Sequence, residues 1–218
     1  MFNYCPPIKL PDLKSVTSDD GKRYYVTPNG IRLPSVTTVV GASKKQAILD
    51  WRDRVGHEEA NRISYKASSR GTVVHSLCED YLNNKPIGNP MPDVLMMFNS
   101  IKPIIDNSIT DIWYNEQSLY SEKIGLAGKV DLIAKWNGKL SIIDFKTSTR
   151  IKQRDEILDY FHQECAYALM LEDMVGQPVH QLVTLMAVEN EKPLIFIEKT
   201  KNHIKGLVDV IKYYNNYK

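Results

Sequence analysis

The stretch over residues 128–148 constrains the fold more than any other part of the chain. It reads GKVDLIAKWNGKLSIIDFKTS, with mostly apolar residues on both sides of Asn137-Gly138. Because Asn-Gly tolerates the positive φ angles of a type I′ turn, the pattern predicts two antiparallel strands joined by a tight turn. Charged residues interrupt both strands: Asp131 the first, Asp144 and Lys146 the second. Carboxylates within apolar strands need a compensating partner or a function.

Strand geometry brings these charged residues together. Side chains alternate between faces, so Asp144 and Lys146 share one face and Phe145 lies on the other. The tight turn puts Asp131 opposite Asp144, or one residue diagonal to it, within cross-strand reach. Paired carboxylates suit a hard divalent cation such as Mg²⁺. An adjacent ammonium can orient a water and stabilise charge that develops on a phosphate. We therefore predict that Asp131, Asp144 and Lys146 are catalytic.

The G-x-V-D strand followed by I-D-F-K-T resembles the PD-(D/E)XK nuclease superfamily, in its RecB-like branch. Within that branch the chain is most similar to the mitochondrial genome maintenance exonuclease and related bacteriophage exonucleases, over residues 34–181. The resemblance implies an α/β fold of the mixed α+β kind. In such a fold a central mixed sheet is flanked by helices, as a restriction-endonuclease-like core with an N-terminal helical elaboration.

The same resemblance implies a function. It predicts a Mg²⁺- or Mn²⁺-dependent exonuclease that hydrolyses DNA, on single strands or free ends and with little sequence specificity. Natural settings would be phage recombination or genome degradation in the cytoplasm of a bacterial or phage-infected cell, with any protein partner unknown. A structure-specific endonuclease and a non-catalytic DNA-binding module on the same fold are the alternatives. A hydrolase based on Cys or Ser has little support, because no G-x-S-x-G motif occurs.

Further metal ligands come from the resemblance. His75 and Glu79 are four residues apart and share a helix face. In the arrangement R-G-T-x-x-H-x-x-x-E, the resemblance implies that His75 is a metal ligand and makes Glu79 a candidate. Glu116, on the preceding strand of the sheet, and the main-chain carbonyl of Phe145 complete the expected set. The alternatives are a structural histidine, a salt-bridging Glu79 and an exposed Glu116.

The Q-x-x-x-Y motif of RecB-like nucleases is matched by Gln163 and Tyr167. Their spacing places both on one helix face, where an amide and a phenol can point at substrate or at the catalytic lysine. Hydroxyl and basic side chains near the expected site are candidate DNA contacts, with helix capping, ion pairing or a solvated loop as alternatives. The candidates are Ser35, Thr37, Arg70, Thr147, Ser148, Arg150 and Lys152.

Periodicity and capping residues predict the remaining elements. We expect a hairpin over residues 23–27 and 31–35, and a helix over 44–66 capped by Ser43. Its interleaved basic and acidic residues favour a solvated, ion-paired face, with DNA contact as the second possibility. A further helix over 70–82 would be capped by Ser69. Other helices are expected over 93–107, over 156–174 and from 202 to the chain end, and strands over 112–120, 181–189 and 194–199.

A length of 218 residues fits a single domain, and the resemblance implies that it is a nuclease domain over residues 1–218. We expect an N-terminal extension and hairpin (1–42), a helical part (43–107) and a mixed-sheet catalytic core (108–218). The net charge of +2 does not by itself indicate a nucleic-acid partner. Three scattered cysteines fit a reducing compartment and exclude the four-cysteine iron-sulfur cluster of some RecB-like nucleases. No apolar run is long enough for a membrane span and no secretory or mitochondrial address is visible, so we expect an intracellular chain without a membrane partner.

Overall fold

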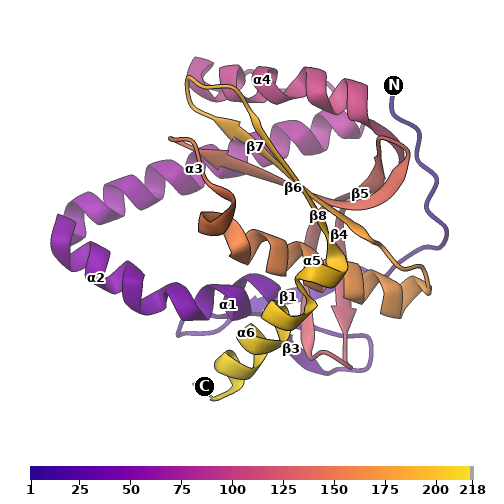
Figure 1. Ribbon diagram of the computed structural model, residues 1–218, viewed down its shortest axis with the longest axis horizontal. Helices are drawn as coiled ribbons and strands as arrows, with labels where there is room; N and C mark the ends of the chain where they lie inside the picture. Colours follow the sequence, from indigo (N-terminus) through magenta and orange to yellow (C-terminus); the bar gives the residue numbers. More distant parts are fainter. Residues whose placement is uncertain (217–218) are drawn as a thin grey trace.

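A five-stranded sheet with helices on both faces forms the centre of the computed structural model, which describes residues 1–216 (Figure 1). The strands of this sheet are β4 (Ile109–Ser121), β5 (Leu126–Trp136), β6 (Lys139–Ser148), β7 (Gln181–Val188) and β8 (Leu194–Lys199). The helices are α1 (Val36–Gly41), α2 (Lys45–Val55), α3 (His57–Leu82), α4 (Pro92–Ser108), α5 (Leu158–Val175) and α6 (Ile204–Asn216). Tyr217 and Lys218, which the expected last helix included, lie outside the described residues.

The sheet is mixed, as predicted. Its order is β4-β5-β6-β7-β8, and every neighbouring pair is antiparallel except β6 and β7. The parallel pair is joined through α5, because parallel strands need a crossover connection. Asn137 and Gly138 have φ angles of 48° and 79°, and Trp136 pairs with Lys139. The predicted tight hairpin is therefore confirmed.

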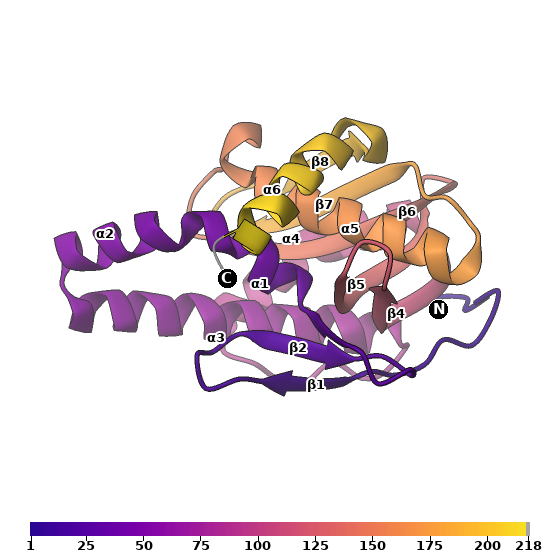
Figure 2. The ribbon, with the colours of Figure 1, turned by 90° about the horizontal axis from the view of Figure 1, so that it is seen from below.

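Two layers of helices cover the sheet (Figures 1 and 2). On one face, α1, α5 and α6 pack over a cluster that includes Ile133 and Ile142. On the other face, α3 and α4 pack over a cluster that includes Ile143 and Phe145. This alternation assigns Asp131 and Asp144 to the α5 face, since each lies two residues from an isoleucine of that cluster.

A small N-terminal sheet lies beside the main one, with strands β1 (Lys14–Thr17), β2 (Arg23–Val26) and β3 (Arg32–Pro34) in that order. The hairpin of β2 and β3 was predicted, and β1 was not. All four residues of β1 are exposed, so its sequence carries no burial pattern to reveal a strand. The bridge between Ser35 and Ala127 then connects this sheet to β5.

The expected helix boundaries between residues 44 and 82 were wrong. Ser43 lies in a short 3₁₀ turn (Ala42–Lys44). The expected helix is interrupted at Gly56, whose φ of 88° is readily adopted only by glycine. Ser69 caps nothing, because α3 continues through it to Leu82. Gly71 also stays helical: a Cβ there would lie 3.7 Å from Thr147 Oγ1, so the glycine fits a helix packed closely against β6.

A helical arm, defined as α2 with residues 57–69 of α3, extends beyond the sheet (Figure 2). It connects α1, which packs on one face of the sheet, to the second half of α3, which packs on the other. Within the arm only Ala60 is buried. Lys44 at its base forms a 2.7 Å ion pair with Asp159 of α5. Among residues 1–216, no helix has both the length and the apolar content that crossing a membrane requires.

Candidate active site

The β5–β6 hairpin sets two carboxylates side by side. Leu132 and Ile143 are the last pair of the β5–β6 ladder, and Asp131 and Asp144 are the next residues along the two strands. The main-chain N–H of Phe145 donates to Asp131 Oδ2 at 2.9 Å, which fixes that carboxylate across the strands. Asp144 is almost fully buried, and its carboxylate contacts the ammonium of Lys146. The structure thus brings together the three residues predicted from the hairpin.

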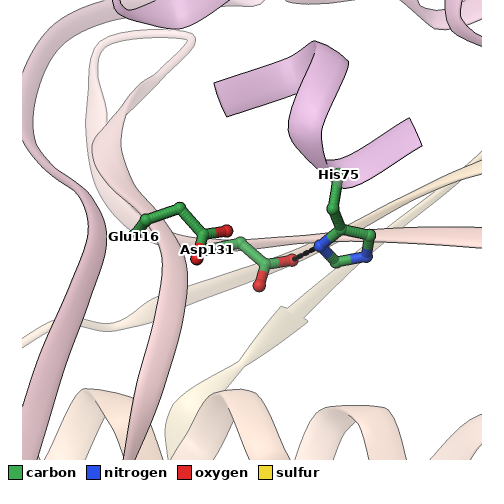
Figure 3. Close-up of side chains that lie close together, drawn as sticks. All are labelled: His75, Glu116 and Asp131. Atoms are coloured by element: carbon green, nitrogen blue, oxygen red, sulfur yellow. Dashed lines mark ion pairs between the residues drawn. The ribbon is translucent and has the colours of Figure 1, made fainter. Parts of the chain in front are cut away.

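Two further ligand-type side chains reach Asp131 from other elements (Figure 3). His75, on α3, places Nδ1 3.3 Å from Asp131 Oδ2. Glu116 comes from β4, and one ligand atom from each of His75, Glu116 and Asp131 lies within 4.8 Å of the others. Glu116 has a φ of 53°, an unusual value for a non-glycine residue inside a strand. Such backbone conformations cost energy and cluster at functional sites.

The electrostatics show unbalanced negative charge in this cluster. Burial, and then the neighbouring charge of Asp144, raises the pKa of Asp131 well above its ordinary value. Burial and the charge of Lys146 lower the pKa of His75, which favours the neutral imidazole. Burial alone would lower the pKa of Lys146, but Asp144 and Asp131 outweigh it and raise that pKa. The site therefore holds a firmly charged ammonium and a neutral imidazole beside crowded carboxyl groups.

The donor set fits a divalent cation. Carboxylate oxygens are preferred by Mg²⁺, and neutral imidazole is available at His75. A bound cation would also offset the repulsion that raises the pKa of Asp131. The main chain of Phe145 is among the groups that influence the pKa of His75, so that peptide lies near the imidazole. Glu79 is outside the compact cluster, and its main-chain carbonyl instead accepts from Asn115 Nδ2 at 3.1 Å.

Helix α5 supplies the next layer of contacts. Gln163 Nε2 donates to Asp144 Oδ1 at 3.1 Å, and both side chains are buried. Tyr167, one turn later, is also buried, and burial raises the pKa of its phenol. Its ring approaches Gly128 so closely that a Cβ on this glycine would lie 2.8 Å from Tyr167 Cε1. The Q-x-x-x-Y spacing thus places an amide on Asp144 and a phenol against β5.

A cavity of about 220 Å³ opens onto these groups. Its lining combines the catalytic candidates with residues of the small N-terminal sheet and α1: Arg23, Tyr25, Ser35, Thr37, His75, Gly128, Lys129, Asp131, Lys146, Gln163 and Tyr167. Ser35 and Thr37, predicted DNA contacts, are therefore brought to the site. Ser35 is also the N-cap of α1, because its hydroxyl accepts from Thr38 N at 3.1 Å.

The other predicted DNA contacts lie around the end of β6 and are mostly engaged within the chain. Arg70 is 8% exposed and lies 3.6 Å from Glu189. The Ser148 hydroxyl donates to the carbonyl of Arg150 at 2.6 Å. Arg150 is ion-paired to Glu156, and Thr147 and Lys152 are half-buried. We call these five predicted contacts the rim residues: Arg70, Thr147, Ser148, Arg150 and Lys152. On the arm, Arg62 pairs with Glu59, as expected for a solvated helix face.

Four neighbours of the site were missed by the sequence analysis. Lys129 Nζ lies 2.8 Å from Glu116 Oε2, and Lys146 Nζ lies 5.0 Å from the centroid of the Tyr160 ring. Lys129 is two residues before Asp131 on the same strand, a spacing that could have identified it. Tyr160 precedes Gln163 by three residues, so helical spacing could have done the same.

The remaining pair is buried beneath α5. Thr184 Oγ1 donates to Glu164, which is completely buried, and burial together with Asp144 raises the pKa of this carboxyl. Thr184 is also the β7 partner of Asp144. The sequence signal for this pair was Glu164, a carboxylate within a mostly apolar helical segment.

Comparison with known protein families gives a match over the main sheet and α5. Residues 106–207, which are 102 of the 218, match the family model of the PD-(D/E)XK nuclease superfamily. The matched segment is just under half of the chain. It spans β4 to the start of α6, and so contains Glu116, Asp131, Asp144 and Lys146. No curated protein matches the chain significantly.

Among solved structures the similarity is low. A protein from Eubacterium rectale described as a candidate exonuclease aligns with 66% of this chain at 11% identity and a TM-score of 0.45. The chain spans 64% of that protein's length. The protein SSO0001 aligns with 82% of this chain and 75% of its own, at 12% identity and a TM-score of 0.39.

Proposed function

We propose that the protein is a metal-dependent nuclease that hydrolyses DNA phosphodiester bonds. The observation that carries this proposal is the convergence of Asp131, Asp144 and Lys146 on one face of a strand pair, with His75 facing them from α3. An ammonium paired with a buried carboxylate has no evident structural use, because replacing such groups with apolar residues is often neutral or stabilising. The match to the nuclease superfamily supports the same conclusion.

The residues divide into three roles. His75, Asp131 and Asp144 would hold Mg²⁺ or Mn²⁺ together with the Phe145 carbonyl, and Glu116 is a further ligand because it is part of the compact cluster. When bound, the cation would polarise the phosphate and lower the pKa of the attacking water.

Lys146 orients that water and neutralises charge that develops on the phosphate. Gln163 holds Asp144 Oδ1, which keeps the other carboxylate oxygen toward Lys146. Tyr167 lines the same cavity and faces the substrate. The Gln163–Asp144 and Asp144–Lys146 contacts that support these roles are present without substrate.

The finer assignment is an exonuclease of the RecB-like branch, similar to the mitochondrial genome maintenance exonuclease and to phage enzymes. The arm supports a single-stranded substrate. It connects helices on the two faces of the sheet, and residues next to both of its ends, Ser35 and Thr37 at one and His75 at the other, line the cavity. A strand that passes beneath the arm needs a free end. The phosphates of this DNA strand would contact Ser35, Thr37 and the rim residues. Its bases would stack on Trp51, which is half-buried.

The test is digestion of end-labelled linear and of circular single-stranded DNA with Mg²⁺, with Mn²⁺ or with EDTA. We expect the linear DNA to be shortened stepwise only with metal, while circles survive and the label position gives the polarity. Cleaved circles would instead indicate an endonuclease. DNA binding without cleavage under any of these conditions would indicate a non-catalytic binding module.

A further inference from the structure

Tyr160, at the start of α5, contacts the catalytic lysine and has no role in the reaction described so far. Lys146 Nζ lies 5.0 Å from the centroid of the Tyr160 ring. An ammonium within about 6 Å of a ring centroid is attracted to the negative face of the ring. The same Nζ contacts the carboxylate of Asp144. The ammonium is therefore held between a carboxylate and an aromatic ring.

One side of α5 organises this part of the site. Tyr160, Gln163 and Tyr167 follow one another at helical spacing of three and four residues. Tyr160 contacts Lys146, and Gln163 donates to Asp144 Oδ1 at 3.1 Å. Tyr160 and Gln163, about one helical turn apart, thus contact the two members of the Asp144–Lys146 ion pair. This correspondence points to a positioning function for Tyr160 as well as for Gln163.

The ring itself makes the contact. Tyr160 is half-buried and packs against a small apolar cluster: Ile157, Phe161, Met186, Val188, Leu194 and Phe196. The Lys146 side chain is 18% exposed, so the ring shields its ammonium from water. Across residues 1–216 the Tyr160 hydroxyl takes part in no hydrogen bond, which leaves the aromatic face as the group that acts on Lys146.

We propose that Tyr160 is a positioning residue that holds the Lys146 ammonium against Asp144 through its ring face. The proposal rests on the nuclease function proposed above. It requires a ring at this position and does not require the hydroxyl. Because Lys146 acts on developing charge, loss of the ring should lower kcat and leave substrate binding unchanged.

The first test compares Tyr160→Phe with Tyr160→Leu in steady-state cleavage of linear single-stranded DNA with Mg²⁺. We expect Tyr160→Phe to stay within about 2-fold of the original kcat, and Tyr160→Leu to lose about 10-fold with KM changed by less than about 2-fold. Phe196→Leu is the matched control, because it alters the same cluster away from Lys146, and its kcat should stay near the original. A raised KM with unchanged kcat in Tyr160→Leu would mean that the ring stacks on substrate, and would overturn the proposal.

The second test does not depend on cleavage. An amine-acylating reagent is applied to the protein without metal, and mass spectrometry compares acylation of Lys146 with that of exposed Lys139 on the same strand. Tyr160→Leu should raise the relative acylation rate of Lys146 by at least about 5-fold, and Tyr160→Phe should not. If Tyr160→Leu fails to fold, Tyr160→Met replaces it in both tests.

The two proposals fail in different ways. A wild-type protein that cleaves no DNA overturns the nuclease function, and the acylation result then still decides whether Tyr160 holds Lys146. Wild-type cleavage combined with equal acylation and equal kcat in Tyr160→Leu overturns only the role of Tyr160.

Discussion

Lys146 is the residue on which the proposed chemistry depends most directly. It is held by Asp144 and lies in the cavity with Asp131. Lys146→Met removes the charge and keeps a similar length, so we expect kcat for DNA cleavage to fall by at least about 100-fold. Thermal unfolding should remain cooperative. Lys139→Met, at the exposed start of the same strand, is the control, and a Lys146→Met protein that retains full activity would exclude the proposed role.

Asp131 shows a conflict between stability and function. Its pKa is raised by burial and by the charge of Asp144, so the charged form is unfavourable without a cation. Asp131→Asn keeps an oxygen that can accept from the main chain of Phe145. We expect it to abolish cleavage and to raise the metal-free unfolding free energy by about 1–2 kcal/mol.

Urea denaturation with EDTA measures this effect. Asp19→Asn, at an exposed position, should change neither stability nor cleavage. Mg²⁺ should stabilise the wild type more than Asp131→Asn, because only the former keeps the full ligand set. A less stable Asp131→Asn protein in EDTA would contradict the electrostatic account.

At the scale of elements, the contact between β5 and α5 depends on one glycine. Gly128→Ala would place a Cβ 2.8 Å from the Tyr167 ring, closer than ordinary packing allows. The ring must shift, and we expect about a 10-fold or greater loss of kcat with a loss of stability of about 1–3 kcal/mol. Gly88→Ala, which meets no atom within 4 Å, should be neutral in both assays. Unchanged activity in Gly128→Ala would mean that the position of Tyr167 does not matter.

Glu198 connects β8 to the segments that immediately precede α5 and α6. Its carboxylate accepts from Arg154 Nε at 2.5 Å and lies 3.0 Å from His203 Nε2. The hydrogen bond from Arg154 is the main cause that lowers the pKa of Glu198 below 4.5. Glu198→Gln should therefore destabilise the protein by about 1–3 kcal/mol near neutral pH.

The pH dependence of this effect has a definite sign. Because the folded pKa of Glu198 is below its unfolded value, its stabilisation is complete above about pH 4.5 and is lost as the pH falls through the folded pKa. The stability difference between wild type and Glu198→Gln should therefore shrink from about pH 7 to about pH 3. Glu191→Gln, on the exposed turn before β8, is the control. A difference that grows toward low pH would refute the assignment.

The elements that the sequence predicted well are those specified by local chemistry. Asn137-Gly138 determined the turn, and alternation then determined which residues share a face with Asp144. Ser69 misled because a serine inside a helix and a serine at a cap look alike, and only the packing of α3 on the sheet distinguishes them. Gly71 was expected inside a helix, as the structure shows, and its packing against β6 could not be read from the sequence.

The candidate site was predictable for similar reasons, up to a limit. Asp131, Asp144 and Lys146 meet across one short turn, so their proximity follows from strand pairing alone. His75 and Gln163 needed the resemblance, because their approach depends on how α3 and α5 pack. Lys129, Tyr160 and Glu164 had local sequence signals, but their partners lie on other elements or farther along the chain, and those signals do not specify which residues they contact.

At the scale of the whole molecule, stability is distributed unevenly along α3. Its second half contributes Val74, Leu77, Cys78 and Leu82 to a core cluster, whereas in the arm only Ala60 is buried. Segments with few buried contacts open with low free energy. We therefore expect amide hydrogens of the arm to exchange much faster than those over residues 74–82, although residues 57–69 of the arm belong to the same continuous helix.

Amide hydrogen exchange also tests whether substrate bound at the site contacts the arm. Lys146→Met with Mg²⁺ allows DNA to bind without being consumed. Addition of linear single-stranded DNA should slow exchange in the arm by about 10-fold, because a bound strand restricts local opening. Exchange in β8, on the far edge of the sheet, should not change, and circular single-stranded DNA should protect the arm less than linear DNA of equal length. Equal protection by both would show that binding at the arm needs no free end, which would favour the endonuclease over the exonuclease.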